Sequence, residues 1–151
     1  MRRGILKSIA GLIAAAGLVG LLGCGGEDEV SLTKAQFVKK GNEICLKSEK
    51  ERLAVLEETA GKLGVNPGRV PSQSTQQKVI LAGIPSYEEA AQKLGEIAPD
   101  GEEEKVEAMV EAMEEAADKV RADPGTALVS GIQFENADKL LEAYGLENCA
   151  V

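Results

Sequence analysis

Histidine is absent from all 151 residues, so the chain lacks the side chain that most often serves as a general base or a transition-metal ligand. A serine or cysteine nucleophile therefore has no imidazole to activate it. The remaining residues with covalent chemistry are three cysteines, Cys24, Cys45 and Cys149. Catalysis would depend on carboxylates alone, and we predict neither an enzyme nor a bound cofactor.

Acidic side chains crowd onto residues 102–118, where a helix is expected. They are Glu102, Glu103, Glu104, Glu107, Glu111, Glu114, Glu115 and Asp118. Two acids at helical spacing suit a hard cation such as Ca²⁺, but one rigid helix cannot wrap about six oxygens around it. We interpret this cluster as a solvated face. Met109 and Met113 are soft metal ligands in principle, yet they fall on the apolar stripe of the same helix and are predicted to be core. No metal site is predicted.

The first 24 residues have the layout of an export signal. Residues 1–8 carry three basic side chains, and residues 9–22 form an uncharged, apolar run of 14 residues. That run is shorter than the roughly 20 residues that a helix needs to span a bilayer. Paired arginines at positions 2 and 3 fit either an ordinary secretory signal or a twin-arginine signal, so the export route stays open.

The apolar run ends in Leu-Leu-Gly-Cys at residues 21–24, which resembles the lipobox of bacterial lipoproteins. In such a motif, small Gly23 lets the signal peptidase approach, and the Cys24 sulfur accepts the diacylglycerol. We predict a signal peptide over residues 1–23, lipid on Cys24 and a location on the extracytoplasmic side of the cell membrane.

Loss of residues 1–23 leaves 14 basic and 25 acidic residues, a net charge of −11. Such a domain is repelled by phosphates, which argues against a nucleic-acid partner and against lying flat on anionic lipid. Membrane contact is therefore expected through Cys24 alone. Residues 24–31 are rich in glycine and acid and are predicted to be a flexible tether, followed by one domain over residues 32–151.

Helical spacing of apolar residues continues through that domain. Thr33 and Gln36 form a capping box for a helix that ends at Gly64. A proline- and glycine-containing loop over 64–74 precedes a second helix, predicted to continue through Pro85 with a kink although Ser86 and Glu89 offer a new cap.

A third helix should begin at an Asp100–Glu103 cap and end before a loop at Asp123, Pro124 and Gly125. A fourth carries Phe134, Ala137, Leu141 and Tyr144 on one face. It should stop at Gly145 in a Schellman motif that packs Leu146 on Leu141. We predict an all-α fold, a small antiparallel bundle of about four helices.

The mature chain resembles small cysteine-bearing envelope proteins of actinobacteria, a group without an assigned activity. The resemblance rests on residues 37–45, 78–81, 123–124 and 144–149 and on the placement of the cysteines. It implies a disulfide between the first helix and the C-terminus. Parity agrees, because lipidation consumes Cys24 and leaves Cys45 and Cys149 as a pair in an oxidising compartment.

The function expected from these features is that of a lipid-anchored, noncatalytic binding or scaffold module of the cell envelope, with an envelope protein as its partner. The alternative is a lipid-anchored carrier of a small ligand or cation. A protein partner would require an exposed apolar patch, a carrier would require a cavity with convergent polar groups, and an enzyme would require perturbed carboxylates in a cleft.

Overall fold

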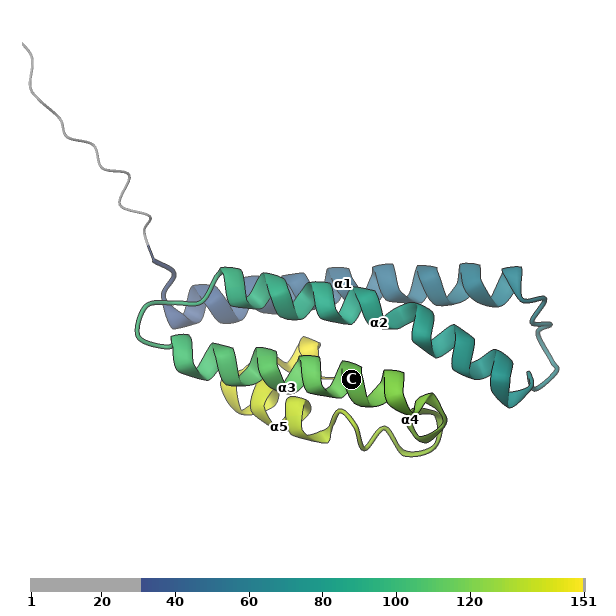
Figure 1. Ribbon diagram of the computed structural model, residues 1–151. Helices are drawn as coiled ribbons and strands as arrows, with labels where there is room; N and C mark the ends of the chain where they lie inside the picture. The colour runs from purple at the N-terminus through teal and green to yellow at the C-terminus, as the bar shows by residue number, and fades with distance from the viewer. Residues whose placement is uncertain (1–30, 151) are drawn as a thin grey trace, which may run out of the picture. The chain divides into compact units, whose positions relative to one another are not determined.

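Helices make up the regular structure of residues 31–150, the part of the chain that this computed structural model describes (Figure 1). They are α1 (Lys34–Lys62), α2 (Gln73–Glu96), α3 (Glu103–Ala122), α4 (Pro124–Ser130), α5 (Glu135–Tyr144) and a closing 3₁₀ turn, η1 (Glu147–Cys149). These residues contain no strand, which confirms the predicted all-α class. The predicted signal peptide and Cys24 lie outside the described residues. No helix within residues 31–150 is both long and apolar enough to cross a membrane.

The start of α1 follows the capping box read from the sequence. The Gln36 N–H donates to Thr33 Oγ1 at 3.3 Å, and the Thr33 N–H donates to Gln36 Oε1 at 2.9 Å. Two amides of the first turn are thereby satisfied. Phe37, next in the chain, is fully buried. The cap therefore fixes the point at which α1 enters the core.

α2 continues through Pro85, as predicted, and Figure 1 shows it changing direction near its middle. Proline removes one N–H from the helical ladder and crowds the preceding turn, which accounts for a bend at this place. The Ser86–Glu89 cap is unused because the helix does not restart there. Instead the Ser86 carbonyl accepts a hydrogen bond from Ser48 Oγ of α1 at 2.5 Å.

The predicted Asp100–Glu103 cap of the third helix is wrong. Glu102 is the residue that precedes α3, and its side chain makes no capping bond. Gly101 has a φ of 80°, and the Glu102 N–H donates to the Pro99 carbonyl at 3.0 Å, so a turn separates Asp100 from the helix. The Asp100 N–H donates to Ser31 Oγ at 3.0 Å instead.

The prediction of a loop at residues 123–125 is also wrong, because an additional helix, α4, begins at Pro124. Asp123 Oδ1 accepts the N–H groups of Gly125 and Thr126 at 3.1 and 3.2 Å, and Pro124 takes the first helical position. An aspartate cap followed by proline is a favourable start for a helix, since proline needs no N–H partner there. The described residues thus contain five helices rather than about four.

The end of α5 is the predicted Schellman motif. Gly145 has a φ of 101°, the Leu146 N–H donates to the Leu141 carbonyl at 2.8 Å, and the Gly145 N–H donates to the Glu142 carbonyl at 3.0 Å. Leu141 and Leu146 are both fully buried. The turn sends the chain back toward α1, where η1 packs.

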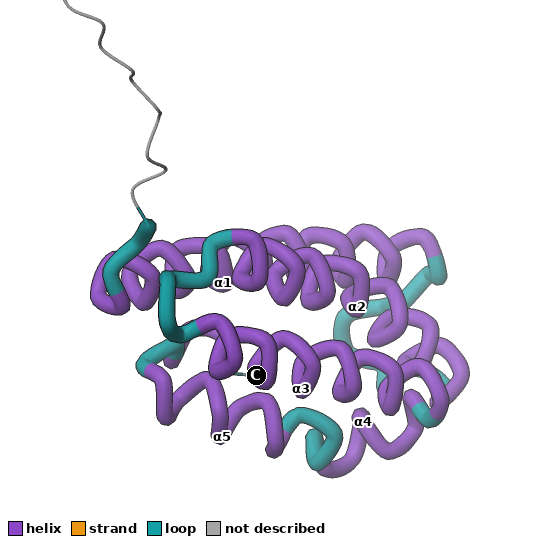
Figure 2. Tube along the Cα trace, turned by 60° about the vertical axis from the view of Figure 1, so that its left-hand side comes forward, coloured by secondary structure: helices purple, strands orange, loops and turns teal. Residues whose placement is uncertain are grey.

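The helices pack in sequence order, α1 on α2, α2 on α3 and α3 on α5, while α4 contacts α2 and α3. Figures 1 and 2 both show α1 beside α2 and α5 beside α3. The largest side chains with less than 2% exposure come from α1, α2, α3, α5 and the segments that follow α2 and α5, and they are Phe37, Leu94, Pro99, Val106, Met113, Val120, Leu141 and Leu146. One shared core therefore joins these elements.

Candidate functional site

The two cysteines predicted to pair form a disulfide, with their Cα atoms 5.0 Å apart. Cys45 lies on α1 and Cys149 ends η1, 104 residues later, and both are buried. The bond therefore joins the first helix to the last turn of the described chain, which confirms that prediction. Cys24, the predicted lipid site, is not among the described residues.

The acidic cluster of α3 is met by basic side chains. Lys105 Nζ lies 2.8 Å from Glu102 and lowers its pKa through that hydrogen bond, and Lys119 lies 2.9 Å from Glu115. Arg121 binds Glu88 of α2 and Asp118. Within residues 31–150, no group of three or more metal-binding side chains is arranged to hold an ion.

Met109 and Met113 lie in the core, as predicted. Their exposed fractions are 2% and 1%. Both belong to the apolar stripe of α3, where a flexible thioether fills gaps between larger side chains. Neither sulfur is placed to meet a soluble ion.

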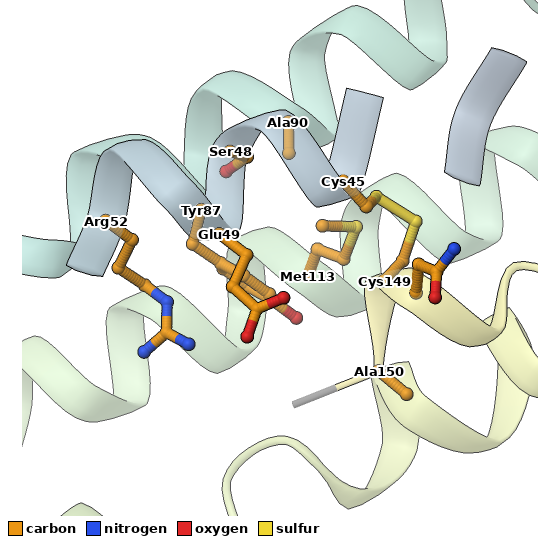
Figure 3. Close-up of a pocket in the computed structure, with 10 residues that line it drawn as sticks. Cys45, Ser48, Glu49, Arg52, Tyr87, Ala90, Met113, Cys149 and Ala150 are labelled. Atoms are coloured by element: carbon orange, nitrogen blue, oxygen red, sulfur yellow. A yellow bond between two sulfur atoms is a disulfide. The ribbon is translucent and has the colours of Figure 1, made fainter. Parts of the chain in front are cut away.

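Two adjoining cavities between α1 and α2 form the candidate site. The first, about 130 Å³, lies beside the disulfide, and its mixed lining includes the polar residues Ser48, Glu49 and Arg52 (Figure 3). The second, about 220 Å³, shares Arg52 and Tyr87 with the first. We call the pair the Arg52–Tyr87 groove. Their combined volume falls at the lower end of the range of about 300–1,000 Å³ found for small-molecule pockets.

The second cavity is apolar apart from its boundary with the first. Its walls come from α1, α2, α4 and the segment before α5, and they include Leu56, Ile80, Ile84, Ala127 and Phe134. Arg52 is the one charged residue among its lining residues. Apolar walls with a single cation at one end favour a ligand whose two ends differ in polarity.

Arg52 and Tyr87 are held at this boundary by close packing of α1 on α2. A Cβ atom added to Gly83 would lie 3.0 Å from Arg52 Cγ and 3.1 Å from Leu56 Cδ2, so only a glycine admits the Arg52 stem this closely. The hydrogen bond from Ser48 to the Ser86 carbonyl ties the two helices together one turn away. Tyr87 follows Ser86 directly and packs its ring edge-to-face on Phe134, with centroids 5.4 Å apart.

The polar groups at the boundary have unused hydrogen-bonding capacity. Arg52 is half-buried and makes no ion pair with any residue of the described range. Tyr87 is only 7% exposed, and its hydroxyl has no hydrogen-bond partner within residues 31–150. Figure 3 shows this hydroxyl beside the Glu49 carboxylate, with the Arg52 guanidinium apart from it. A buried hydroxyl without a partner is costly, so a hydrogen bond to this atom would stabilise the protein.

Burial raises the pKa of Tyr87 far above its ordinary value, and the negative charge of Asp138 raises it further. The hydroxyl therefore keeps its proton at every physiological pH and acts as a hydrogen-bond donor. Together with the Arg52 guanidinium, it is one of two donors where the two cavities meet, and its oxygen has almost no accessible surface. No proton transfer follows from this arrangement.

The sequence pattern places Tyr87 on the apolar stripe of the second helix but does not single out Arg52. The spacing of Arg52 could have indicated its role, because Arg52 stands four residues after Ser48 and four before Leu56 on the same face of the first helix. A cation in the middle of an apolar stripe must find a polar environment or remain partly exposed. The groove supplies that environment.

The chain matches no known family model, no curated protein and no solved structure. The resemblance to actinobacterial envelope proteins therefore stays a prediction. Function must be argued from the groove itself.

Proposed function

We propose that this protein is a noncatalytic binding protein of the cell envelope, an antiparallel helical bundle anchored to the membrane through lipid on Cys24, that holds a small ligand in the Arg52–Tyr87 groove. One observation carries the binding role. An apolar cavity of about 220 Å³ is bordered by a guanidinium and a buried hydroxyl, neither of which has a partner among residues 31–150. Convergent polar groups at the edge of an apolar cavity are typical of a ligand site.

The small number of carboxylates in the groove supports binding over catalysis. Glu49 is the only carboxylate among the lining residues of the two cavities, and it is exposed. The pKa values of Glu58, Glu89, Glu102, Glu103 and Asp123 are lowered, and none of these residues lines the groove. A general acid or base working near neutral pH would need a raised one.

A protein partner is the second candidate, because two exposed apolar residues adjoin the groove in sequence. Leu53, next to Arg52, is 52% exposed, and Ile132, next to Gly131, is 55% exposed. A larger partner seated over the groove would contact these two side chains. A small ligand would contact the interior of the groove, whereas a protein partner would contact the exposed residues beside it.

Photocrosslinking in intact cells separates the two candidates. A diazirine-bearing leucine analogue is placed at Leu56 inside the groove or, as the matched control, at Leu53 on the same helix. We expect an adduct of small-molecule mass at position 56 and none at position 53. A protein-sized adduct at position 53 would favour the second candidate. Adducts at neither position would contradict a binding role.

The anchor is tested separately with Cys24→Ala and a labelled fatty acid. Cys24 supplies the acceptor sulfur, so the variant should incorporate no label and should leave the membrane fraction. Cys45 and Cys149 are joined to each other and cannot replace it. Equal labelling of the variant and the unmodified sequence would remove the anchor from the proposal without affecting the groove.

A further inference from the structure

We propose that the Arg52–Tyr87 groove binds a single-chain anionic amphiphile, with its carboxylate or phosphate at Arg52 and Tyr87 and its hydrocarbon chain in the apolar cavity. The inference deepens the proposed function and rests on it, since it assumes that the groove holds a small ligand. The carboxylate and phosphate forms share one recognition chemistry and are separated by the test below.

The sign of the headgroup follows from which charged residues line each cavity. Arg52 lines both cavities, whereas Glu49 lines only the first. Arg52 is the one cation among the lining residues of the two cavities, and a carboxylate or phosphate at their junction accepts two parallel hydrogen bonds from it. A cationic headgroup would leave Arg52 unpaired and would be repelled by it.

The Tyr87 hydroxyl supplies the second contact. It is more than nine-tenths buried, lacks a partner within residues 31–150 and retains its proton. A protonated phenol donates one hydrogen bond, which suits an anionic oxygen better than a cationic nitrogen. Ligand binding would satisfy the one polar atom that folding leaves unsatisfied in this wall.

The chain of the ligand is specified by the second cavity. Leu56, Ile80, Ile84 and Phe134 offer hydrocarbon contact and no further hydrogen-bonding side chain. An apolar cavity of about 220 Å³ suits a short unbranched chain rather than a sugar or a nucleotide. Chain burial provides affinity, and the headgroup contact provides orientation.

The test uses the full-length protein as isolated from cells, held in phosphatidylcholine nanodiscs, with octanoate labelled with ¹³C at its carboxyl group. Binding is measured as broadening of the carboxyl resonance relative to empty nanodiscs. Octyl phosphate, octanol and octyltrimethylammonium are then compared as competitors of equal chain length.

We expect octanoate to bind and octanol to compete at least about tenfold more weakly, because a charge-assisted hydrogen bond is lost. Octyltrimethylammonium should not compete. The ratio of octyl phosphate to octanoate affinity identifies which anionic headgroup the site prefers. Competition by octanol or by the cation as effective as that of octanoate would overturn the inference.

Two pairs of variants locate the contact. Arg52→Gln keeps much of the stem and should weaken octanoate binding about tenfold, while Arg69→Gln, at an exposed arginine outside the groove, should leave it unchanged. Tyr87→Phe should weaken binding about two- to tenfold, and Tyr144→Phe should have no effect. Circular dichroism melts confirm that each variant is folded.

Failure of this inference is distinct from failure of the proposed function. If octanoate does not bind but a small adduct still forms at position 56, the groove holds a ligand of another class and the anionic amphiphile is excluded. If Arg52→Gln binds octanoate normally, the headgroup lies elsewhere and the inference is wrong. If neither octanoate nor an adduct is found, both proposals fall together.

Discussion

The domain contains two edge-to-face pairs of a tyrosine and a phenylalanine, and only one of them is covered. Phe37 and Tyr144 have ring centroids 5.5 Å apart at an interplanar angle of 83°, and Tyr87 and Phe134 repeat this arrangement at 5.4 Å and 82°. Phe37 is fully buried, whereas Phe134 is half-buried and lines the apolar cavity with Tyr87. The same contact belongs to a packed core in one region and to the wall of a groove in the other.

The difference arises from what lies on α1. Near its start, Asn42 Nδ2 donates to the Gly145 carbonyl and Asn42 Oδ1 accepts the Asn148 N–H, each at 2.9 Å, and the disulfide fixes η1 against the helix. We call this region the closed region. Farther along α1, Arg52 and Leu56 line the groove together with Ala127 of α4 and Phe134, and this stretch of the helix faces a cavity instead of a packed core.

Removal of the disulfide should have the largest effect on this contrast. Cys45→Ala combined with Cys149→Ala releases a closed loop of about a hundred residues, for which chain entropy predicts a loss of about 4–5 kcal/mol in the free energy of unfolding. The expected result is a urea midpoint far below that of the unmodified protein, measured by circular dichroism. A loss below about 1 kcal/mol would mean that η1 stays on α1 without the bond.

Truncation of one leucine in each region measures how tightly that region is packed. Leu146→Ala removes a side chain with no exposure and should cost about 2–5 kcal/mol in the free energy of unfolding. Leu56→Ala, in the half-buried wall of the groove, should cost about 1 kcal/mol, because less area leaves water on folding there. Equal losses in urea melts would show that the groove is as tightly packed as the core.

The closed region is also the one that the sequence predicts well. The Thr33 cap, the Gly145 stop and the disulfide depend on local spacing and on cysteine parity, so they can be recognised without knowing which helices meet. The groove cannot be, because it depends on where η1 ends along α1 and on how far α4 reaches. Arg52 gains its significance only when Tyr87, 35 positions later, lies beside it.

The two incorrect predictions about helix starts, at Asp123 and at Asp100, have a similar origin. Asp123 before Pro124 fits a helix cap, but the sequence Asp-Pro-Gly fits a loop equally well. The helix that follows, α4, has only seven residues and is therefore hard to recognise from its sequence. Asp100 stands three residues before Glu103, which is the spacing of a capping box. The turn at Gly101 nevertheless makes Glu102, and not Asp100, the residue that precedes the helix. Local spacing determines a cap only when the helix start is already known.

The two close approaches of α1 to its neighbours offer a subtler comparison. A Cβ atom on Gly41 would lie 2.6 Å from Leu146 Cδ2 and 3.0 Å from Leu94 Cδ2, and both leucines are fully buried. Gly41→Ala should therefore destabilise the protein by about 1–3 kcal/mol despite the better helix propensity of alanine.

Gly83→Ala is the matched variant in the groove. Its Cβ would lie 3.0 Å from Arg52 Cγ and 3.1 Å from Leu56 Cδ2, and both of these side chains are half-buried, unlike the two leucines at Gly41. We expect a change within about 1 kcal/mol of zero, because the gain in helix propensity offsets the displacement. Differential scanning calorimetry of the two variants checks the contrast, and a larger loss from Gly83→Ala than from Gly41→Ala would reverse it.

The smallest expected effect has the opposite sign. Tyr87→Phe removes a buried hydroxyl that has no hydrogen-bond partner in the described chain, so the free protein should gain about 1 kcal/mol of stability and melt a few degrees higher.

Tyr144→Phe is the matched variant in the closed region. The Tyr144 hydroxyl also lacks a well-aligned bond, but burial and the neighbouring Glu102 carboxylate raise its pKa to about 12, and loss of that contact offsets the gain. We therefore expect Tyr144→Phe to leave the melting temperature nearly unchanged. A melting temperature lowered by Tyr87→Phe would show that the hydroxyl is already satisfied in the free protein. It would then have no hydrogen bond left to offer a ligand.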